Sequence, residues 1–313
     1  MKYFDKERKK KMIVNLRMEI TAKLLVPVLV TVLITCGNVA YAKDAYRIEG
    51  VLVYENFEDD DDLETKVYGL SVKVHFQPVH PKNHPLAEAA FMERVGHIEL
   101  NGGQQEAEMG SLIEGDGPFY GVVLNYTQPG NPFVFKAGYT RVDFDFDRPS
   151  SINSDSNIFE VGLGYFIKDG FFLGLEYKNV DSELSVAGVT VSERDEDKYT
   201  LYSKYVNEIG DGRAWNVEVS AAINDFDRSN DDGNNAIFEI ELDYYFNLKI
   251  SVGAELSLNI GDDKDDEGRT VGIDTTAFIN SQFALALKYE WFDAEETEGE
   301  DEDVYFIGCL VRF

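Results

Sequence analysis

Apolar and polar residues alternate along most of the chain, in segments of about ten residues that begin at Tyr46. Alternation at period two places successive side chains on opposite faces of a β-strand. A strand of about ten residues is also long enough to cross a membrane when it is tilted. Fourteen strands are predicted on this basis: 46–56, 66–77, 92–102, 118–128, 132–146, 157–168, 171–182, 197–207, 213–226, 234–246, 248–260, 269–280, 282–293 and 303–313.

The segment 248–260 shows the pattern most cleanly. Its apolar series is Leu248, Ile250, Val252, Ala254, Leu256, Leu258 and Ile260, and the positions between them are small, polar or charged. Such a strand suits a soluble β-sandwich that turns its apolar face inward. It equally suits a membrane barrel that turns the same face toward lipid.

Two further features favour the barrel. Aromatic residues stand near the ends of the apolar faces, where the interfacial girdles of a membrane barrel belong. The connections also alternate in kind: those after even-numbered strands are mostly tight, as at 128–132, 169–170, 208–212 and 281–282, whereas 57–65, 261–268 and 294–302 are long and carry six, five and six acidic residues. The prediction is therefore an all-β, closed antiparallel transmembrane meander barrel of about 14 strands, with 12 to 16 possible.

The pattern is weakest between residues 78 and 112. Three of the eight prolines fall within 78–86, which predicts a turn. Pro85 is placed to open a short helix over 86–94, because proline is tolerated in a first helical turn. This stretch is predicted to be an unusually long connection that leads into the strand at 92–102.

The final strand, DVYFIGCLVRF, ends the sequence on an aromatic residue. Tyr305, Ile307, Cys309, Val311 and Phe313 share one apolar face. Such a strand resembles the closing strand of a bacterial outer-membrane barrel, whose C-terminus is recognised by the barrel assembly machinery. The resemblance implies that Tyr305, Val311 and Phe313 form an assembly signal, and an even strand count lets this strand pair with 46–56.

The N-terminus has the organisation of an export signal. Basic residues precede an apolar run over 24–34, and Ala40 and Ala42 occupy the small positions of a cleavage site. Residues 1–42 are predicted to be a cleaved signal peptide and 43–313 the barrel, with initiation at Met12 or Met18 giving a more usual signal length. Lipidation at Cys36 is disfavoured by Thr35, and the apolar run is short for an uncleaved anchor.

The net charge of the chain limits the classes of molecule that it can be expected to bind. The whole chain carries −29; without residues 1–42 it has 21 basic residues (29 less 8) and 55 acidic ones (58 less 3), a net charge of −34. This negative charge argues against nucleic acid and other anionic partners, and it favours cationic ones. Beyond residue 40 no apolar run of eighteen residues is present, which argues against a helical membrane protein.

The signal peptide, the terminal phenylalanine, the strand meander and the segment PLAEAAFMERVGHIELN at 85–101 together resemble the general bacterial porins of Gram-negative outer membranes. That resemblance implies an outer-membrane porin-like channel for passive diffusion of small hydrophilic solutes, with lipid and lipopolysaccharide around it and a homotrimer possible. Met92 and the Gly96–His97 pair depart from the family pattern.

If the apolar faces point to lipid, the opposite positions line the lumen. The expected pore-lining residues are Glu49, Glu55, Lys73, Lys136, Glu160, Glu176, Lys178, Lys204, Glu218, Glu239, Glu241, Asp243, Lys249, Glu255, Asp274, Lys288, Glu290 and Arg312. Eleven of them are acidic and seven basic, so they can pair across strands. Their acidic excess predicts a preference for cations in an open pore. How far the predicted loops at 104–117 and 183–196 fold inward is expected to decide how open the pore is.

Two weaker patterns concern metals. Asp263, Asp265, Glu267 and Asp274 approximate the spacing of a calcium loop, but the final ligand is Asp and strands flank the stretch, so a solvated loop is favoured. The four histidines cluster between 75 and 97, where prolines make a shared helical face improbable. No cofactor or metal is therefore expected.

The sequence leaves two alternatives to a pore: a barrel hydrolase and a structural or adhesive barrel. A barrel hydrolase needs a Ser/His pair, or carboxylates with a histidine, near the external rim, and no histidine lies near the predicted external loops. A structural or adhesive barrel with acidic external loops is the other alternative to a pore.

Overall fold

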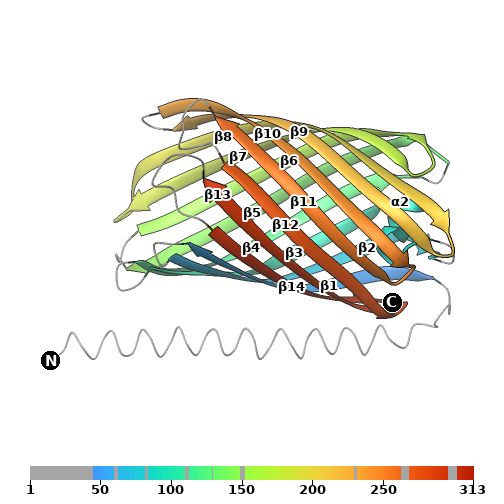
Figure 1. Cartoon of the computed structure of the whole chain (residues 1–313). Coiled ribbons are helices and arrows are strands. Elements are labelled where there is room, and N and C mark those ends of the chain that lie inside the picture. Colours follow the sequence, from blue (N-terminus) through green and yellow to red (C-terminus); the bar gives the residue numbers. More distant parts are fainter. Residues whose placement is uncertain are drawn as a thin grey trace. The chain divides into compact units, whose positions relative to one another are not determined.

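The computed structural model describes residues 45–59, 63–81, 84–109, 113–128, 130–148, 152–228, 231–261, 268–294 and 302–313. Within them, fourteen antiparallel strands form one closed barrel (Figure 1). The strands are β1 (Tyr46–Asp59), β2 (Leu63–Val79), β3 (His97–Met109), β4 (Ile113–Thr127), β5 (Phe133–Arg148), β6 (Ile152–Lys168), β7 (Phe171–Val186), β8 (Val189–Gly210), β9 (Arg213–Arg228), β10 (Asp231–Asn247), β11 (Ile250–Gly261), β12 (Gly268–Asn280), β13 (Phe283–Ala294) and β14 (Glu302–Arg312). The predicted fourteen-stranded meander barrel is confirmed. The predicted signal peptide, residues 1–42, lies outside the described residues.

The first and last strands close the sheet. β14 pairs antiparallel with β1, with Arg312 opposite Glu49 and Cys309 opposite Leu52. Eleven residue pairs form this seam. β1 and β14 are therefore paired with a neighbouring strand on both sides, as the other strands are. Closure removes the two sheet edges that an open meander would leave unpaired.

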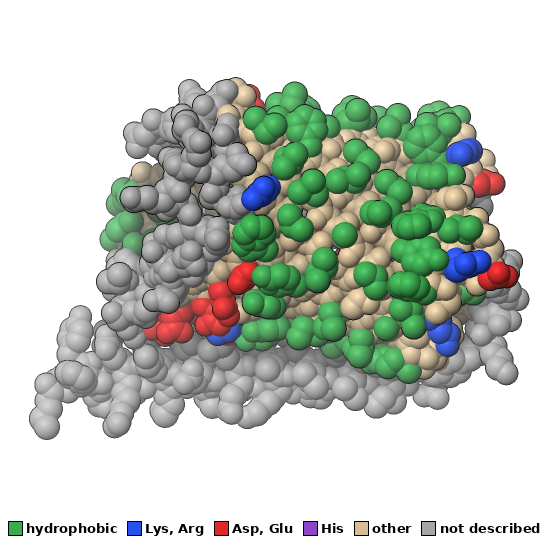
Figure 2. Space-filling model, viewed as in Figure 1, with side chains coloured by type: hydrophobic (Ala, Val, Ile, Leu, Met, Phe, Trp, Pro, Cys, Tyr) green, Lys and Arg blue, Asp and Glu red, His purple; other side chains and the backbone are tan. Residues whose placement is uncertain are grey.

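The outer face of the barrel is apolar over its middle. Figure 2 shows this surface in the view of Figure 1, with hydrophobic side chains across the centre and charged side chains gathered toward the two ends. Large apolar side chains on this face are highly exposed; Leu163 is 65% exposed and Ile279 is 63% exposed. Such exposure would be costly in water, whereas lipid tails would cover it.

Two belts of aromatic pairs border this apolar band. One belt includes Tyr54–Tyr68, Tyr177–Tyr199 and Tyr289–Tyr305, with ring centroids 5.1–5.3 Å apart. The other includes Phe76–Tyr126, Phe133–Tyr165, Phe171–Tyr205 and Trp215–Tyr244, at 4.6–6.2 Å. On β2 the belts are eight residues apart, from Tyr68 to Phe76, which corresponds to roughly 20 Å along the barrel axis for a strand tilted by about 40°. The belts mark where the barrel meets the two surfaces of a bilayer.

We call the end that carries the connections after even-numbered strands the turn end, and the opposite end the loop end. At the loop end the strands run well past the aromatic belt; β8 has 22 residues, about twice the length needed to cross a membrane. The expected loops at 104–117 and 183–196 are largely strand. β7 and β8 are joined by Ala187 and Gly188 alone, both at positive φ as a two-residue hairpin turn requires.

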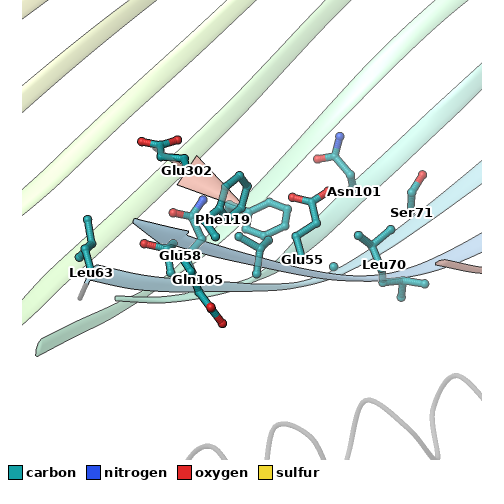
Figure 3. A pocket seen from close by; sticks show the side chains of 14 residues that line it. Glu55, Glu58, Leu63, Leu70, Ser71, Asn101, Gln105, Phe119 and Glu302 are labelled. Atoms are coloured by element: carbon teal, nitrogen blue, oxygen red, sulfur yellow. The ribbon is translucent and has the colours of Figure 1, made fainter. Parts of the chain in front are cut away.

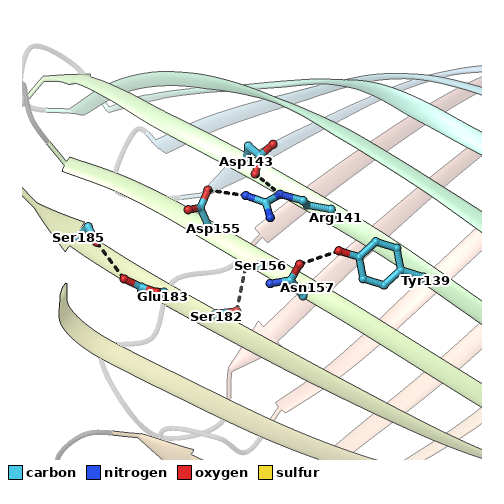
Figure 4. A network of polar contacts seen from close by, with 9 residues as sticks. All are labelled: Tyr139, Arg141, Asp143, Asp155, Ser156, Asn157, Ser182, Glu183 and Ser185. Atoms are coloured by element: carbon cyan, nitrogen blue, oxygen red, sulfur yellow. Dashed lines mark hydrogen bonds and ion pairs between the residues drawn. The ribbon is translucent and has the colours of Figure 1, made fainter. Parts of the chain in front are cut away.

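Polar cross-strand contacts explain why these extensions remain strand. On β5 and β6, just beyond Tyr139, the Arg141 guanidinium contacts Asp143 at 2.6 Å and Asp155 at 3.7 Å (Figure 4). The Tyr139 hydroxyl donates to Asn157 at 2.8 Å. Since both faces of the sheet are wet beyond the membrane, alternating polar residues can extend the ladder, and the period-two apolar signal disappears although the strand continues.

The described helices all lie in the connection between β2 and β3. η1 (Leu86–Glu88) and α2 (Ala89–Met92) follow Pro85, as the sequence predicts. β3 begins at His97, so the predicted strand at 92–102 starts five residues late. In the part of the chain that the structure describes, no helix has the length and apolar character to cross a membrane.

Candidate functional site: the barrel lumen

The polar inner wall is the candidate site, and strand alternation positions it. On β11 the outward residues Val252 and Leu258 are exposed, whereas Ser251, on the opposite face, is 4% exposed. The same alternation turns inward Glu49, Lys73, Lys136, Glu160, Glu176, Lys178, Lys204, Glu218, Glu239, Glu241, Asp243, Glu255, Asp274, Lys288, Glu290 and Arg312. These sixteen residues therefore share one face of the sheet, whereas Lys249, also expected there, lies in the turn between β10 and β11.

Charges on β5, β6 and β7 compensate one another. The Lys136 ammonium lies 2.8 Å from Glu160 and 2.9 Å from Glu176. Lys178 stands opposite Glu160 in the β6–β7 register. On β2 and β3, Lys73 contacts Glu99 at 3.7 Å, and Ser71 donates to the same carboxylate at 2.6 Å. This half of the wall holds carboxylates and ammonium groups in comparable number.

The wall formed by β9 to β12 is different. Among the side chains that the structure describes, its inward positions carry six carboxylates: Glu218, Glu239, Glu241, Asp243, Glu255 and Asp274. Among the described side chains at these positions there is no lysine, arginine or histidine. Lys204 on β8 and Lys288 on β13 flank the wall; Lys288 contacts Glu255 and Glu290 at 2.8 Å each. We call this the acidic wall.

At the turn end residues 84–96, in the connection between β2 and β3, fold into the barrel, and we call them the inner segment. The backbone N–H of Leu86 donates to Leu248 O at 2.8 Å, and the Arg312 guanidinium donates to Leu86 O at 2.9 Å. Further along, the Phe91 ring packs on Phe166 and Phe172, with centroids 5.2 and 6.3 Å apart. Because β14 and β11 lie on one side of the barrel and β6 and β7 on the other, the inner segment crosses the lumen.

Glu88 is the polar anchor of the inner segment. It is 6% exposed, and its carboxylate lies 2.8 Å from the Lys204 ammonium and accepts a 2.8 Å hydrogen bond from the Tyr245 hydroxyl. Lys204 also contacts Glu218 at 2.7 Å and lies over the Phe91 ring at 5.0 Å. Two carboxylates thus share one ammonium, and the arrangement joins the inner segment to the acidic wall.

Arg312 and Glu49 form a second anchor beneath the inner segment. The pair is 2.7 Å apart, with Arg312 2% and Glu49 8% exposed. The Arg312 guanidinium also lies over the Tyr46 ring at 4.4 Å and the Phe278 ring at 4.7 Å. These two predicted lumen residues are therefore buried beneath the inner segment, at the seam between β1 and β14.

The inward course of the inner segment and its anchor are not predicted by the sequence. The sequence predicts loops at 104–117 and 183–196, whose inward folding would decide how open the pore is, but the described residues of both stretches are mainly strand. Glu88 and Glu99 are absent from the predicted lumen set. The available signal is a cluster of apolar residues in a connection, at 86, 87 and 89–91, because an exposed turn has no reason to carry five apolar side chains in six positions.

The structure describes one of the four candidate residues of the calcium-like pattern. Asp263, Asp265 and Glu267 lie outside the described residues, and Asp274 is an inward residue of β12 rather than part of a loop. His75 is 2% exposed and packs between the rings of Tyr46 and His97, at 5.5 Å from each. Over the described ranges, no group of three or more His, Cys, Asp or Glu side chains is arranged to hold a metal ion.

Comparisons with known proteins identify the architecture. No protein-family model and no curated sequence matches the chain. Among solved structures it is similar to the outer membrane protein Omp33 of Acinetobacter baumannii, with a TM-score of 0.56 and 16% identity over 86% of this chain and 99% of that one. It is also similar to the CymD monoaromatic hydrocarbon channel, with a TM-score of 0.53 and 8% identity over 87% and 90% of the two chains. At these identities the chain shares the fold of outer-membrane β-barrels.

Proposed function

We propose that the protein is an outer-membrane channel of a Gram-negative bacterium, through which small hydrophilic solutes diffuse passively and cations are preferred. The observation that carries the proposal is the acidic wall inside a closed barrel whose outside is apolar. Six carboxylates along one side of a low-dielectric tube attract cations and repel anions. The two aromatic belts fit a barrel that spans a bilayer.

The orientation follows from the connections. In this proposal the turn end faces the periplasm and the strand extensions of the loop end project outside, next to lipopolysaccharide. The chain reaches the membrane through the predicted cleaved signal peptide and the barrel assembly machinery. N-terminal sequencing of the mature protein should then begin at Lys43.

Ion selectivity tests the proposal. Purified protein is inserted into planar bilayers under a salt gradient, and the sign of the reversal potential gives the preferred ion. We expect cation preference, weakened in a Glu239→Gln, Glu241→Gln double variant of the acidic wall. Lys136→Gln is the matched control, because it alters a compensated cluster on the opposite wall. Anion preference of the wild-type channel would refute the assignment.

A non-conducting structural or adhesive barrel is the second candidate. The inner segment favours it, because a connection that crosses the lumen at the turn end obstructs a straight path. This alternative would be supported if the folded barrel inserts into bilayers but carries no current, both as the wild type and as a variant that lacks the inner segment. Hydrolysis of phospholipid or peptide substrates by the purified barrel would support an enzyme instead. Cross-linking in membranes tests the possible homotrimer.

A further inference from the structure

A second feature of the lumen lies near the loop end, away from the acidic wall. A cavity of about 660 Å³ is formed on the inside of β1 to β4, next to the end of β14 (Figure 3). Its volume falls within the range of small-molecule sites in proteins, about 300–1,000 Å³. A site of that size in the path of a solute can hold a molecule rather than only let it pass.

The floor of the cavity is apolar and follows one row of the sheet. Val53 pairs with Gly69, Gly69 with Gly103, and Gly103 with Phe119, so the four residues stand side by side on β1, β2, β3 and β4. A Cβ built on Gly103 would lie 2.6 Å from the Phe119 ring, and one on Gly69 would lie 3.6 Å from it. The ring therefore lies across the two glycines, with one side on the sheet and the other toward the lumen.

Negative charge borders this aromatic surface. Glu55 lies on the inner face of β1, between Val53 and Phe57, and lines the cavity together with Glu302. Figure 3 shows Glu55 and Phe119 on the same side of the strands. Lys288 is the cation near Glu55, but its ammonium already contacts Glu255 and Glu290 at 2.8 Å each. The described lining residues include no lysine, arginine or histidine.

An aromatic ring, an apolar floor and carboxylates at one edge are complementary to one class of molecule. A cation with an apolar or aromatic body can place its body on Phe119 and its charge near Glu55, where the ring face and the carboxylate both attract it. A small inorganic ion would leave the apolar floor uncovered, and a neutral hydrocarbon would make no use of the charge on Glu55.

We propose that this cavity is a binding site for amphipathic organic cations, such as aromatic or alkyl amines, through which the lumen selects among cationic solutes. The proposal refines the channel function, but the site itself requires only a folded barrel. Phe119 supplies the contact surface and Glu55 the charge.

Calorimetric titration of the purified barrel in detergent tests the site, with benzyltrimethylammonium as the probe. We expect saturable binding that is tighter than that of tetramethylammonium, which lacks the aromatic body, and of benzyl alcohol, which lacks the charge. Phe119→Ala should weaken probe binding about tenfold, whereas Phe119→Tyr, which keeps the ring, should leave it within about twofold. Glu55→Gln should weaken binding about threefold to tenfold, and the loss should shrink at high salt.

Glu239→Gln is the matched control, because it removes a lumen carboxylate outside the cavity and should leave the dissociation constant unchanged. Absence of saturable probe binding, or equal binding by the wild type and Phe119→Ala, would overturn the proposal, as would equal affinity for the charged and uncharged probes. Far-UV circular dichroism confirms that each variant is folded. The two proposals can be refuted separately. Probe binding without ion current would refute the channel function but support the binding site. Ion current without probe binding would support the channel function but refute the binding site.

Discussion

The contact between Glu88 and Lys204 should hold the inner segment across the turn end. Lys204 has two partners, Glu88 at 2.8 Å and Glu218 at 2.7 Å, and Glu88 is 6% exposed. Replacing Lys204 by methionine leaves Glu88 buried without a cation while the inner segment stays docked. Leaving such a charge unpaired costs about 3–5 kcal/mol, so the ratio of displaced to docked inner segment should rise by roughly 10² to 10⁴.

Glu88→Gln perturbs the same contact from the other side. It removes the charge but keeps an oxygen that can accept from Tyr245, and Lys204 keeps Glu218. Its cost should therefore be smaller, about 1–3 kcal/mol. The two substitutions change the lumen charge in opposite directions, so a purely electrostatic effect on current would have opposite signs. Displacement of the inner segment should instead raise conductance in both.

Single-channel recording in planar bilayers provides the measurement. We expect a larger fraction of time in high-conductance states for both variants, with the greater increase for Lys204→Met. Lys136→Met is the matched control, since Lys136 also contacts two carboxylates but makes no contact with the inner segment. If Lys204→Met and Glu88→Gln shift the current in opposite directions, or leave the open fraction at the wild-type value, the contact between Glu88 and Lys204 does not hold the inner segment in place.

Three further predictions concern the seam and the last strand. Arg312→Met should destabilise the barrel to urea in detergent by about 3–5 kcal/mol, because it leaves Glu49 buried without its partner. Arg141→Gln, in a solvent-exposed pair, should have a much smaller effect; equal effects would contradict the anchoring role. Cys309 lies on the outer face of β14, so a water-soluble maleimide should label it slowly in folded protein and quickly after unfolding; fast labelling of folded protein would contradict its facing. Deleting Phe313 should lower the amount of barrel assembled in cells while leaving the urea midpoint of the refolded protein nearly unchanged; normal assembly would count against the proposed signal.

The membrane-spanning part of the fold could be predicted because its rule is local. In 248–260 each residue's place in the alternation assigns it to lipid or lumen, and the barrel closes once the strand count is even. The inward charges followed from the same rule. At the loop end this signal fails, because water wets both faces and strand continues through 183–196 on cross-strand polar contacts.

The inner segment could not be predicted in the same way. Glu88 meets Lys204 and Tyr245, which are more than a hundred residues away in the chain, and no local pattern relates them. A proline-rich connection with a short helix has the same sequence whether it lies outside the barrel or folds into it. The cavity around Phe119 has a similar origin, since its floor depends on glycines of neighbouring strands that the register aligns.

Removing the inner segment tests the channel most directly. The Phe76 N–H donates to Gly96 O at 2.9 Å, so β2 and β3 can be joined there by a two-residue Asn-Gly turn in place of residues 77–95. We expect a folded barrel with a several-fold larger single-channel conductance than the wild type, and with cation preference retained because the acidic wall is unchanged. A folded variant that inserts into bilayers and carries no ion current would contradict it.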